Sequence, residues 1–350
     1  MKKTVLVFSC EPGGAEVLIP VVRLLAQTGS YRVIVLAYGL GLERFRNKGT
    51  ACREIEPIER NDPALFQRYK PDLVITSATS LPERDMSEKY LWQTARQHAV
   101  KTLAFIDQWQ NYAVRFSGPS EGERLAYLPD YINCIDELGR KEMIAEGFRD
   151  QGLLTLGHPY LSGVPALYAG IKSEMAANFQ AADDCRNTLL FVSEPIKEHF
   201  AGSRGYDQYQ SLDLLLSNVL AFRKSAKVII KLHPKDDLAN YQQVAGRYKA
   251  LDIRFIRNEL SSLECLALTE LVFGMSSIML IEAFILGKTV VSIQPHLIVD
   301  DPLLLSRHNM VARIKDYAAF DPFGFISEVH EGLQVHFDGD NFIRFLAADF

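Results

Sequence analysis

Short apolar runs alternate with longer amphipathic stretches along most of the chain. The apolar runs cover residues 4–9, 32–37, 72–76, 102–106, 131–135, 153–156, 188–192, 227–232, 253–256 and 271–274. Apolar runs of this length, without regular polar alternation, are typical of strands that are buried on both faces of a sheet. Because amphipathic stretches of helical length separate most of them, the pattern predicts an α/β protein with parallel sheets.

The stretch from residue 271 to 294, LVFGMSSIMLIEAFILGKTVVSIQ, combines these features. It predicts a strand, a turn containing Ser276 and Ser277, an apolar helix and a parallel return strand. The two serines can cap the helix, or they can hold a phosphate at its N-terminus. N–H groups there lack intrahelical partners and the helix dipole favours an anion. Glu282 is a carboxylate on an otherwise apolar helix and therefore needs a partner.

A second candidate contact to phosphate follows the apolar run 227–232, which ends in His233, Pro234 and Lys235. The imidazole of His233 can donate a hydrogen bond to a phosphate oxygen, with Lys235 as a nearby cation. The alternative is a histidine that only terminates the strand. His158 precedes a proline at the end of the first half; it can face a ligand cleft, but a histidine beside a proline turn is more often exposed, so we expect it to be exposed.

Candidate residues of the first half follow its predicted strands. Gly13 and Gly14 form a loop without the G-x-G-x-x-G pattern, so a dinucleotide site is not indicated, and they either make a tight turn or line a ligand cleft. Asp107 directly follows the run 102–106, and open α/β sheets bind their ligands at such carboxyl ends of strands. Trp109 and Asn111 come next and suit a sugar face with its hydroxyls, unless Asp107 only caps this loop and the tryptophan packs inside.

The stretch around Ser276 resembles the nucleotide-binding motif of enzymes with the GT-B fold. In non-hydrolysing UDP-N-acetylglucosamine 2-epimerases, a Ser-Gly-Gly turn precedes a helix whose glutamate binds the ribose hydroxyls, and Gly-Lys-Pro-Val follows. The residues that match this pattern are Ser276, Glu282, Gly287, Lys288 and Val290. The resemblance covers mainly the C-terminal half of the chain.

The same region is also similar to bacterial sialyltransferases and to capsule and teichoic-acid glycerophosphotransferases. A Ser-Ser pair holds the donor phosphate in those enzymes, and Ser276-Ser277 stands in its place. Their His-Pro motif, which contacts the donor phosphate or the reacting region, resembles His233-Pro234. The loop from Arg257 would lie where GT-B proteins bind the nucleobase through backbone groups.

The resemblance implies two Rossmann-like domains that face an interdomain cleft. We expect an acceptor domain at 1–156, a linker at 157–186, a nucleotide-sugar donor domain at 187–325, and a C-terminal helix within 326–350 that crosses back to the first domain. The expected donor-binding residues are His233, Lys235, Arg257, Ser276, Ser277 and Glu282. The expected residues of the acceptor side and cleft are Glu11, Gly13, Gly14, Glu16, Trp109, Asn111 and Glu194, with Asp107 as general base and His233 assisting the leaving group.

Three functions remain open at this point. The first is a glycosyltransferase that moves a sugar from a nucleotide-sugar donor to a glycan or lipid-linked acceptor, in bacterial surface-polysaccharide or glycoconjugate synthesis, with peripheral membrane association as an option. The second is a UDP-sugar 2-epimerase, although Thr79 stands in the place of an aspartate of that family. The third is a nucleotide-sugar-binding protein without catalysis.

Composition narrows the choice of partners. The chain has 350 residues, 48% hydrophobic, and a formal net charge of −5, which argues against nucleic acid as the main ligand. Its five cysteines include no C-x-x-C pair, and the apolar run near the N-terminus is too short for a signal peptide, so we expect a cytoplasmic protein. We expect no cofactor and no metal, because the acidic pairs 183–184, 236–237 and 300–301 suit solvated turns.

Overall fold

The computed structural model describes residues 2–60, 62–178, 187–326 and 333–349. Two compact units make up the chain. The first comprises Met1–Gly163 together with Gly332–Phe350, and the second comprises Val164–Glu331. Within the described residues, no helix has both the length and the apolar character that crossing a bilayer requires.

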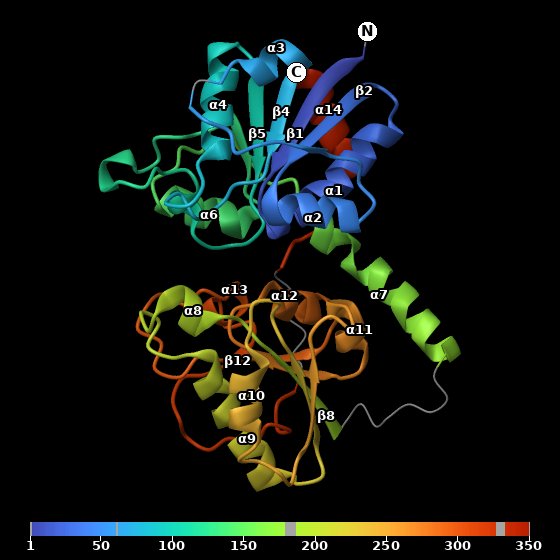
Figure 1. Cartoon of the computed structure of the whole chain (residues 1–350), viewed down its shortest axis with the longest axis vertical. Coiled ribbons are helices and arrows are strands. Elements are labelled where there is room, and N and C mark those ends of the chain that lie inside the picture. Colours follow the sequence, from blue (N-terminus) through green and yellow to red (C-terminus); the bar gives the residue numbers. More distant parts are fainter. Residues whose placement is uncertain (1, 61, 179–186, 327–332, 350) are drawn as a thin grey trace. The chain divides into compact units, whose positions relative to one another are not determined.

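The first unit is built on a seven-stranded parallel sheet with the order β3-β2-β1-β4-β5-β6-β7 (Figure 1). The strands are β1 (Lys3–Ser9), β2 (Tyr31–Ala37), β3 (Arg53–Glu54), β4 (Leu73–Thr76), β5 (Lys101–Phe105), β6 (Tyr131–Asn133) and β7 (Leu153–Leu154). The helices are α1 (Pro12–Gln27), α2 (Gly39–Asn47), α3 (Ala64–Tyr69), α4 (Ser87–Gln97), α5 (Tyr112–Arg115), α6 (Glu137–Ala145) and α14 (Gly339–Asp349), with a 3₁₀ turn at Glu121–Glu123.

Helices cover both faces of this sheet. Val5 and Val7 of β1 pack on the side of α1 and α14, whereas Leu6 and Phe8 pack on the side of α3 and α4. This division follows from the period of two along a strand, and it explains why the first apolar run carries no polar alternation. Helix α14 contributes Phe342 to the first core and lies beside β1 and α1 (Figure 1).

The second unit contains a six-stranded parallel sheet with the order β10-β9-β8-β11-β12-β13. The strands are β8 (Thr188–Val192), β9 (Lys227–Lys231), β10 (Asp252–Ile256), β11 (Leu271–Gly274), β12 (Thr289–Ile293) and β13 (Ala312–Ile314). The helices are α7 (Pro159–Asn178), which begins in the first unit, α8 (Ile196–Phe200), α9 (Gln208–Phe222), α10 (Leu238–Ala245), α11 (Ser262–Ala267), α12 (Ile278–Ile285) and α13 (Leu304–Arg307).

The predicted α/β class with two Rossmann-like units is confirmed. The prediction for His158 is wrong, because this side chain is only 1% exposed. Its Nδ1 accepts the N–H of Leu161 in the first turn of α7, and its Nε2 bonds to the carbonyl oxygen of Asp107 at 3.1 Å. Burial lowers the pKa of His158 to about 4. A neutral imidazole therefore connects the start of α7 with the loop after β5.

Candidate functional site

The loops that follow β9, β8 and β11 lie side by side at the carboxyl edge of the second sheet. They carry His233, Glu194 and Ser276, respectively, and the three strands are consecutive neighbours in the sheet. Adjacent strands are about 4.8 Å apart, so the outer two loops begin about 10 Å from each other. This distance can be bridged by one ligand with a phosphate and a ribose.

The serine turn before α12 forms the best-defined polar cluster of this edge. The N–H and the hydroxyl of Ser276 both donate to the carboxylate of Glu194, at 2.5 and 2.9 Å, and Nη1 of Arg204 donates to the same hydroxyl at 3.1 Å. Ser277 is the N-cap of α12, where its hydroxyl accepts the N–H of Met279 at 3.3 Å. The turn therefore presents backbone donors, hydroxyls and a guanidinium at a helix N-terminus, which is the donor set that an anion needs.

The sequence predicts Glu194 among the acceptor-side residues, whereas its carboxylate lies at this serine turn. Burial raises the pKa of Glu194, while hydrogen bonds from the backbone and hydroxyl of Ser276 and the charge of Arg204 act in the opposite direction. Arg204 was missed by the sequence analysis. It lies in the loop between α8 and α9, where nothing in its local sequence distinguishes it from a surface arginine, yet it is only 9% exposed.

His233 is half-buried in the turn after β9. Its backbone N–H donates to Asp236 at 2.8 Å, and its Nδ1 accepts the N–H of Lys235 at 3.2 Å. In a neutral imidazole the proton is then on Nε2, which makes that nitrogen a hydrogen-bond donor. Burial lowers the pKa of His233, so the neutral form dominates at physiological pH.

The other residues predicted to bind the nucleotide-sugar donor differ in burial and contacts. Lys235 is exposed beside His233, and Ser277 is partly exposed at the turn. Glu282 is only 4% exposed, in the middle of α12, where its neighbours on both sides are also buried. The guanidinium of Arg257 donates to the carbonyl oxygen of Asp236 at 2.5 Å, which ties the loop after β10 to the His233 turn.

The first unit has its own pocket, of about 230 Å³, at the carboxyl ends of β1, β4 and β5. Four predicted residues line it, together with neighbouring polar groups; these residues are Glu11, Gly13, Gly14 and Asp107, with Ser77, Thr79, Ser80, Gln108, Gln110 and Arg115 among the others. The pocket is small and mainly polar in its side chains. Its side chains offer carboxylate, hydroxyl, amide and guanidinium groups to a polar ligand.

Asp107 is held from two directions in this pocket. Its carboxylate forms an ion pair with Nη1 of Arg115 at 2.8 Å, and its side chain remains 20% exposed. Arg115 also donates to the carbonyl oxygens of Ala78 and Gln110, at 2.5 and 3.1 Å. On the other side, a Cβ added at Gly13 would lie 2.4 Å from Oδ2 of Asp107, so only glycine allows the first turn of α1 to approach so closely.

Three residues that the sequence predicts for the cleft do not line this pocket. Glu16 forms ion pairs with Arg44 and Lys48 of the α2 region. The ring of Trp109 is 1% exposed, so the prediction that it offers a face to a sugar does not fit its position. Its indole N–H donates to Asp136 at 2.9 Å. Asn111 is exposed in the left-handed conformation, with φ of 58°, which asparagine adopts more readily than most residues.

Glu88 is a buried acid below the pocket that sequence reasoning missed. The hydroxyl of Ser77 and the N–H of Thr79 donate to its carboxylate, and both of these residues line the pocket. Lys89 follows on the same helix, and its amine reaches the carbonyl oxygen of Thr79 at 3.5 Å. Glu88 is fully buried, and burial raises its pKa to about 7. In the sequence, Glu88 resembles an ordinary surface acid in the first turn of a helix.

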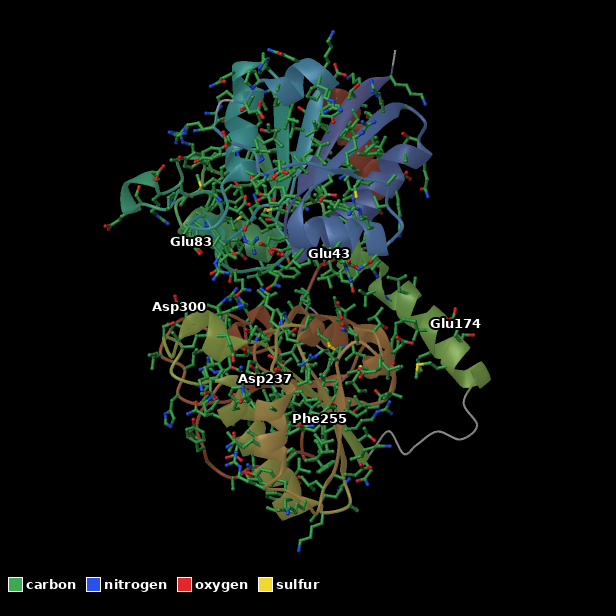
Figure 2. The ribbon with its side chains drawn as sticks, viewed as in Figure 1. Glu43, Glu83, Glu174, Asp237, Phe255 and Asp300 are labelled. Atoms are coloured by element: carbon green, nitrogen blue, oxygen red, sulfur yellow. The ribbon has the colours of Figure 1, made fainter. Side chains whose placement is uncertain are left out.

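The expectation of solvated acidic turns is wrong for two of the six residues. Asp236 is 5% exposed and accepts from His233, while Asp301 is 8% exposed and is paired with Arg313 at 2.8 Å. Asp237 and Asp300 are exposed and belong to the second unit (Figure 2). The pair 183–184 lies outside the described residues. Among the residues that are described, His, Cys, Asp and Glu side chains form no group of three or more that could hold a metal ion.

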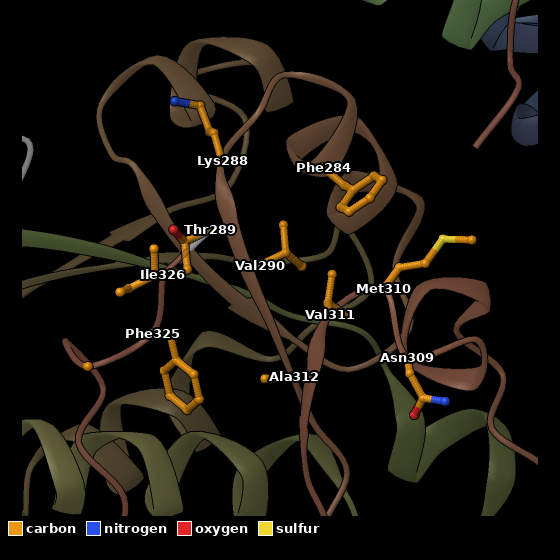
Figure 3. A pocket seen from close by; sticks show the side chains of 11 residues that line it. Phe284, Lys288, Thr289, Val290, Asn309, Met310, Val311, Ala312, Phe325 and Ile326 are labelled. Carbon is orange, nitrogen blue, oxygen red and sulfur yellow. The ribbon is translucent and has the colours of Figure 1, made fainter. Parts of the chain in front are cut away.

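A further pocket of about 440 Å³ lies beside β12 and β13 in the second unit. Figure 3 shows its lining, which includes Phe284, Val290, Met310 and Phe325. It contains none of the predicted donor, acceptor or catalytic residues, and its lining comes from the end of α12, the amino ends of β12 and β13 and the segment after β13 rather than from the carboxyl ends of the strands. It is therefore separate from the serine turn and from the His233 turn.

Similar structures are found over the whole chain. The UDP-GlcNAc 2-epimerase from Neisseria meningitidis, bound to UDP-GlcNAc, has a TM-score of 0.66 at 12% identity and covers 99% of this chain and 100% of its own. Alr3699/HepE from Anabaena, in complex with UDP, has a TM-score of 0.55 at 12% identity, covering 100% and 90%. MurG from Acinetobacter baumannii has a TM-score of 0.54 at 12% identity, covering 90% and 86%.

These likenesses define the class of fold. The chain has the GT-B fold, with two Rossmann-like units in one polypeptide. No family model and no curated protein matches the sequence. At 12% identity the similar structures establish the fold, and the function has to be argued from the residues.

Proposed function

We propose that this protein is a glycosyltransferase that transfers a sugar from a nucleotide-sugar donor to an acceptor hydroxyl. The observation that carries the proposal is the serine turn at the start of α12, where Ser276, Ser277 and Arg204 present the donors that a phosphate requires. Proteins of the same fold, HepE and the Neisseria epimerase, are described with UDP and UDP-GlcNAc bound. Both facts support a nucleotide-sugar ligand.

The two units would divide the reaction. In the second unit the serine turn would hold the donor phosphate, Glu282 would bind the ribose, and Nε2–H of His233 would donate to a phosphate oxygen as negative charge develops on the leaving nucleotide. In the first unit Asp107 would accept the proton of the acceptor hydroxyl while that oxygen attacks the anomeric carbon. Asp107 is partly exposed in a polar pocket and is oriented by Arg115, which suits this role.

A UDP-sugar 2-epimerase is the second candidate, and the full-length likeness to the Neisseria epimerase favours it. Thr79 lines the first-unit pocket in place of an expected acid, and its N–H donates to the buried carboxylate of Glu88. Glu88 would supply an acid close to that position, although its side chain is fully buried. The chemistry of the reaction therefore has to be decided by experiment.

A panel of nucleotide sugars separates the candidates. Each compound is incubated with the protein, with and without hydroxyl acceptors, and the release of nucleotide and the stereochemistry of the recovered sugar are measured. Acceptor-dependent nucleotide release supports the transferase, and conversion to the 2-epimer supports the epimerase. Binding without either reaction would indicate a binding protein. Ser277→Ala should weaken the binding of the active nucleotide by about 1–3 kcal/mol, the usual value for a hydrogen bond to a charged group.

A further inference from the structure

The carboxylate of Glu194 occupies the position where the proposed function places the donor phosphate. It accepts the N–H of Ser276 at 2.5 Å and the hydroxyl of Ser276 at 2.9 Å, and it is hydrogen-bonded by the backbone of Ser277. These are the donors at the N-terminus of α12, a helix of eight residues. A phosphate at the same place would need the same donors, and two anions in one partly buried site repel each other.

We propose that Glu194 is an internal anion that the ligand phosphate displaces, so that nucleotide binding and release of Glu194 from the serine turn form a single equilibrium. The inference rests on the proposed function, because it concerns the same phosphate site. It assigns Glu194 a role in setting the affinity and pH dependence of that site.

The charges around Glu194 support an exchange of one anion for another. Arg204 is 9% exposed and donates to the hydroxyl of Ser276 at 3.1 Å, so its positive charge is fixed beside the turn and can serve either anion. Tyr206 is the next titratable neighbour; it donates to Gln294 at 3.1 Å, and burial raises its pKa, so it stays neutral. Asp301 also acts on Tyr206 and adds negative potential. This environment does not favour a second anion beside Glu194.

The exchange predicts that nucleotide binding is coupled to the uptake of a proton by Glu194. Burial already raises the pKa of Glu194, and an incoming phosphate raises it further because like charges disfavour ionisation. A protonated Glu194 no longer competes for the N–H groups of the serine turn. Anion binding should therefore take up protons, and it should become tighter as the pH falls through the range in which Glu194 becomes protonated.

Glu194→Gln tests the exchange, because it keeps the size of the side chain and removes its charge. Glu198→Gln is the matched control: Glu198 is exposed on α8, only four residues away, and its carboxylate bonds to Gln208 and Tyr209 rather than to the serine turn. The probes are UDP and inorganic sulfate. Sulfate keeps its charge near neutral pH. It carries no nucleobase, so its affinity does not depend on recognition of a particular nucleobase.

Calorimetry and thermal unfolding should show that Glu194→Gln binds both probes about tenfold more tightly than the wild type, whereas Glu198→Gln changes the affinity by less than about twofold. Wild-type affinity for sulfate should rise as the pH falls from 8 to 5. In Glu194→Gln the sulfate affinity should depend less on pH, because only the protonation of His233 then contributes to that dependence. The pH series on the wild type supplies a test even if the variant folds poorly.

Equal or weaker sulfate binding by folded Glu194→Gln, or a wild-type sulfate affinity that does not rise as the pH falls, would overturn the exchange. Failure of the proposed function looks different. In that case no nucleotide sugar of the panel binds or reacts, while the sulfate comparison still reports whether Glu194 competes with an anion at the serine turn.

Discussion

Asp107 and Glu194 are held in similar ways at the scale of single residues. Each carboxylate lies at the first turn of a helix, α1 or α12, and each has a buried arginine beside it. Arg115 pairs with Asp107 directly, whereas Arg204 reaches Glu194 through the hydroxyl of Ser276. The direct pair leaves Asp107 oriented but partly exposed, which is compatible with proton transfer to it. In the indirect arrangement, Glu194 accepts hydrogen bonds from Ser276 groups that could instead bind a ligand.

Asp107→Asn should lower turnover by about 10²–10⁴-fold, because asparagine keeps the shape of the side chain but cannot accept a proton. The affinity for nucleotide should not change, since the proposed phosphate site lies in the second unit. Steady-state kinetics and calorimetry on the same preparation measure the two quantities. Asp150→Asn is the control; Asp150 forms an exposed pair with Arg140 at 2.8 Å and should have little effect on either. Loss of nucleotide affinity with normal turnover in Asp107→Asn would refute the assignment.

Gly14→Ala should destabilise the first unit. A Cβ at this position would lie 2.3 Å from Cβ of Ser77, and neither the helix nor the strand end can move away cheaply. Overpacking of this kind costs about 1–3 kcal/mol. Gly163→Ala is the matched change in helix α7, with no atom within 4 Å of the added Cβ, and it should stabilise the protein by about 0.5–1 kcal/mol. Denaturant titration of both variants measures the change in the free energy of unfolding. Equal changes would show that a Cβ at residue 14 does not clash with Ser77.

At the scale of elements, the loop between β4 and α4 is fixed by buried charged groups. Glu88 accepts from Ser77 and Thr79, and Lys89 approaches the same loop from the same helix. The loop forms one wall of the Asp107 pocket, and Arg115 donates to the carbonyl oxygen of Ala78 near its start. The shape of the pocket therefore depends on interactions that begin outside it.

Glu88→Gln should change how stability depends on pH. The pKa of Glu88 rises from 4.5 to about 7 in the folded protein, so its contribution to stability is present below pH 4.5 and is lost as the pH rises through 7. The size of the loss is about 3 kcal/mol. Glutamine does not titrate, so the free energy of unfolding of the wild type relative to the variant should fall between pH 4.5 and 7. Denaturant titrations across this range measure the difference, and a constant difference would show that Glu88 does not titrate there.

The elements also show what the sequence could predict. Strands buried on both faces, such as β1 and β11, have continuous apolar runs, so their positions and the polar groups that follow them are visible in the sequence. The edge strands β3 and β13 were missed because their sequences, Arg-Glu and Ala-Arg-Ile, form no apolar run, whereas the equally short edge strand β7 lies in the run 153–156. Arg204 and Glu88 were missed for another reason. Their burial results from contacts with residues 72 and 11 positions away, and local sequence does not reveal such contacts.

At the scale of the whole molecule, the chain has the GT-B fold, and each unit has its own hydrophobic core. Both proposed binding regions lie at carboxyl ends of parallel strands, where this kind of sheet binds ligands. The domain limits expected from the sequence and the assignment of donor and acceptor to the two halves stay predictions.

Treatment with EDTA should leave turnover unchanged within about twofold, because the proposed mechanism stabilises the leaving phosphate with a helix N-terminus, Arg204 and His233 instead of a divalent cation. The measurement compares turnover in EDTA with turnover after readdition of Mg²⁺ or Mn²⁺. Strong inhibition that either ion reverses would show that a metal takes part in the reaction.

The chain has two tryptophans, Trp92 and Trp109, and both indoles are buried in the first unit. Their fluorescence is thus an intrinsic spectroscopic label for that unit, while far-ultraviolet circular dichroism records the helices of both. A nucleotide that binds the second unit should raise the midpoint of a dichroism transition and leave the tryptophan transition in place, if the two cores melt separately. Equal shifts of the two signals would mean that the two units unfold as one cooperative body.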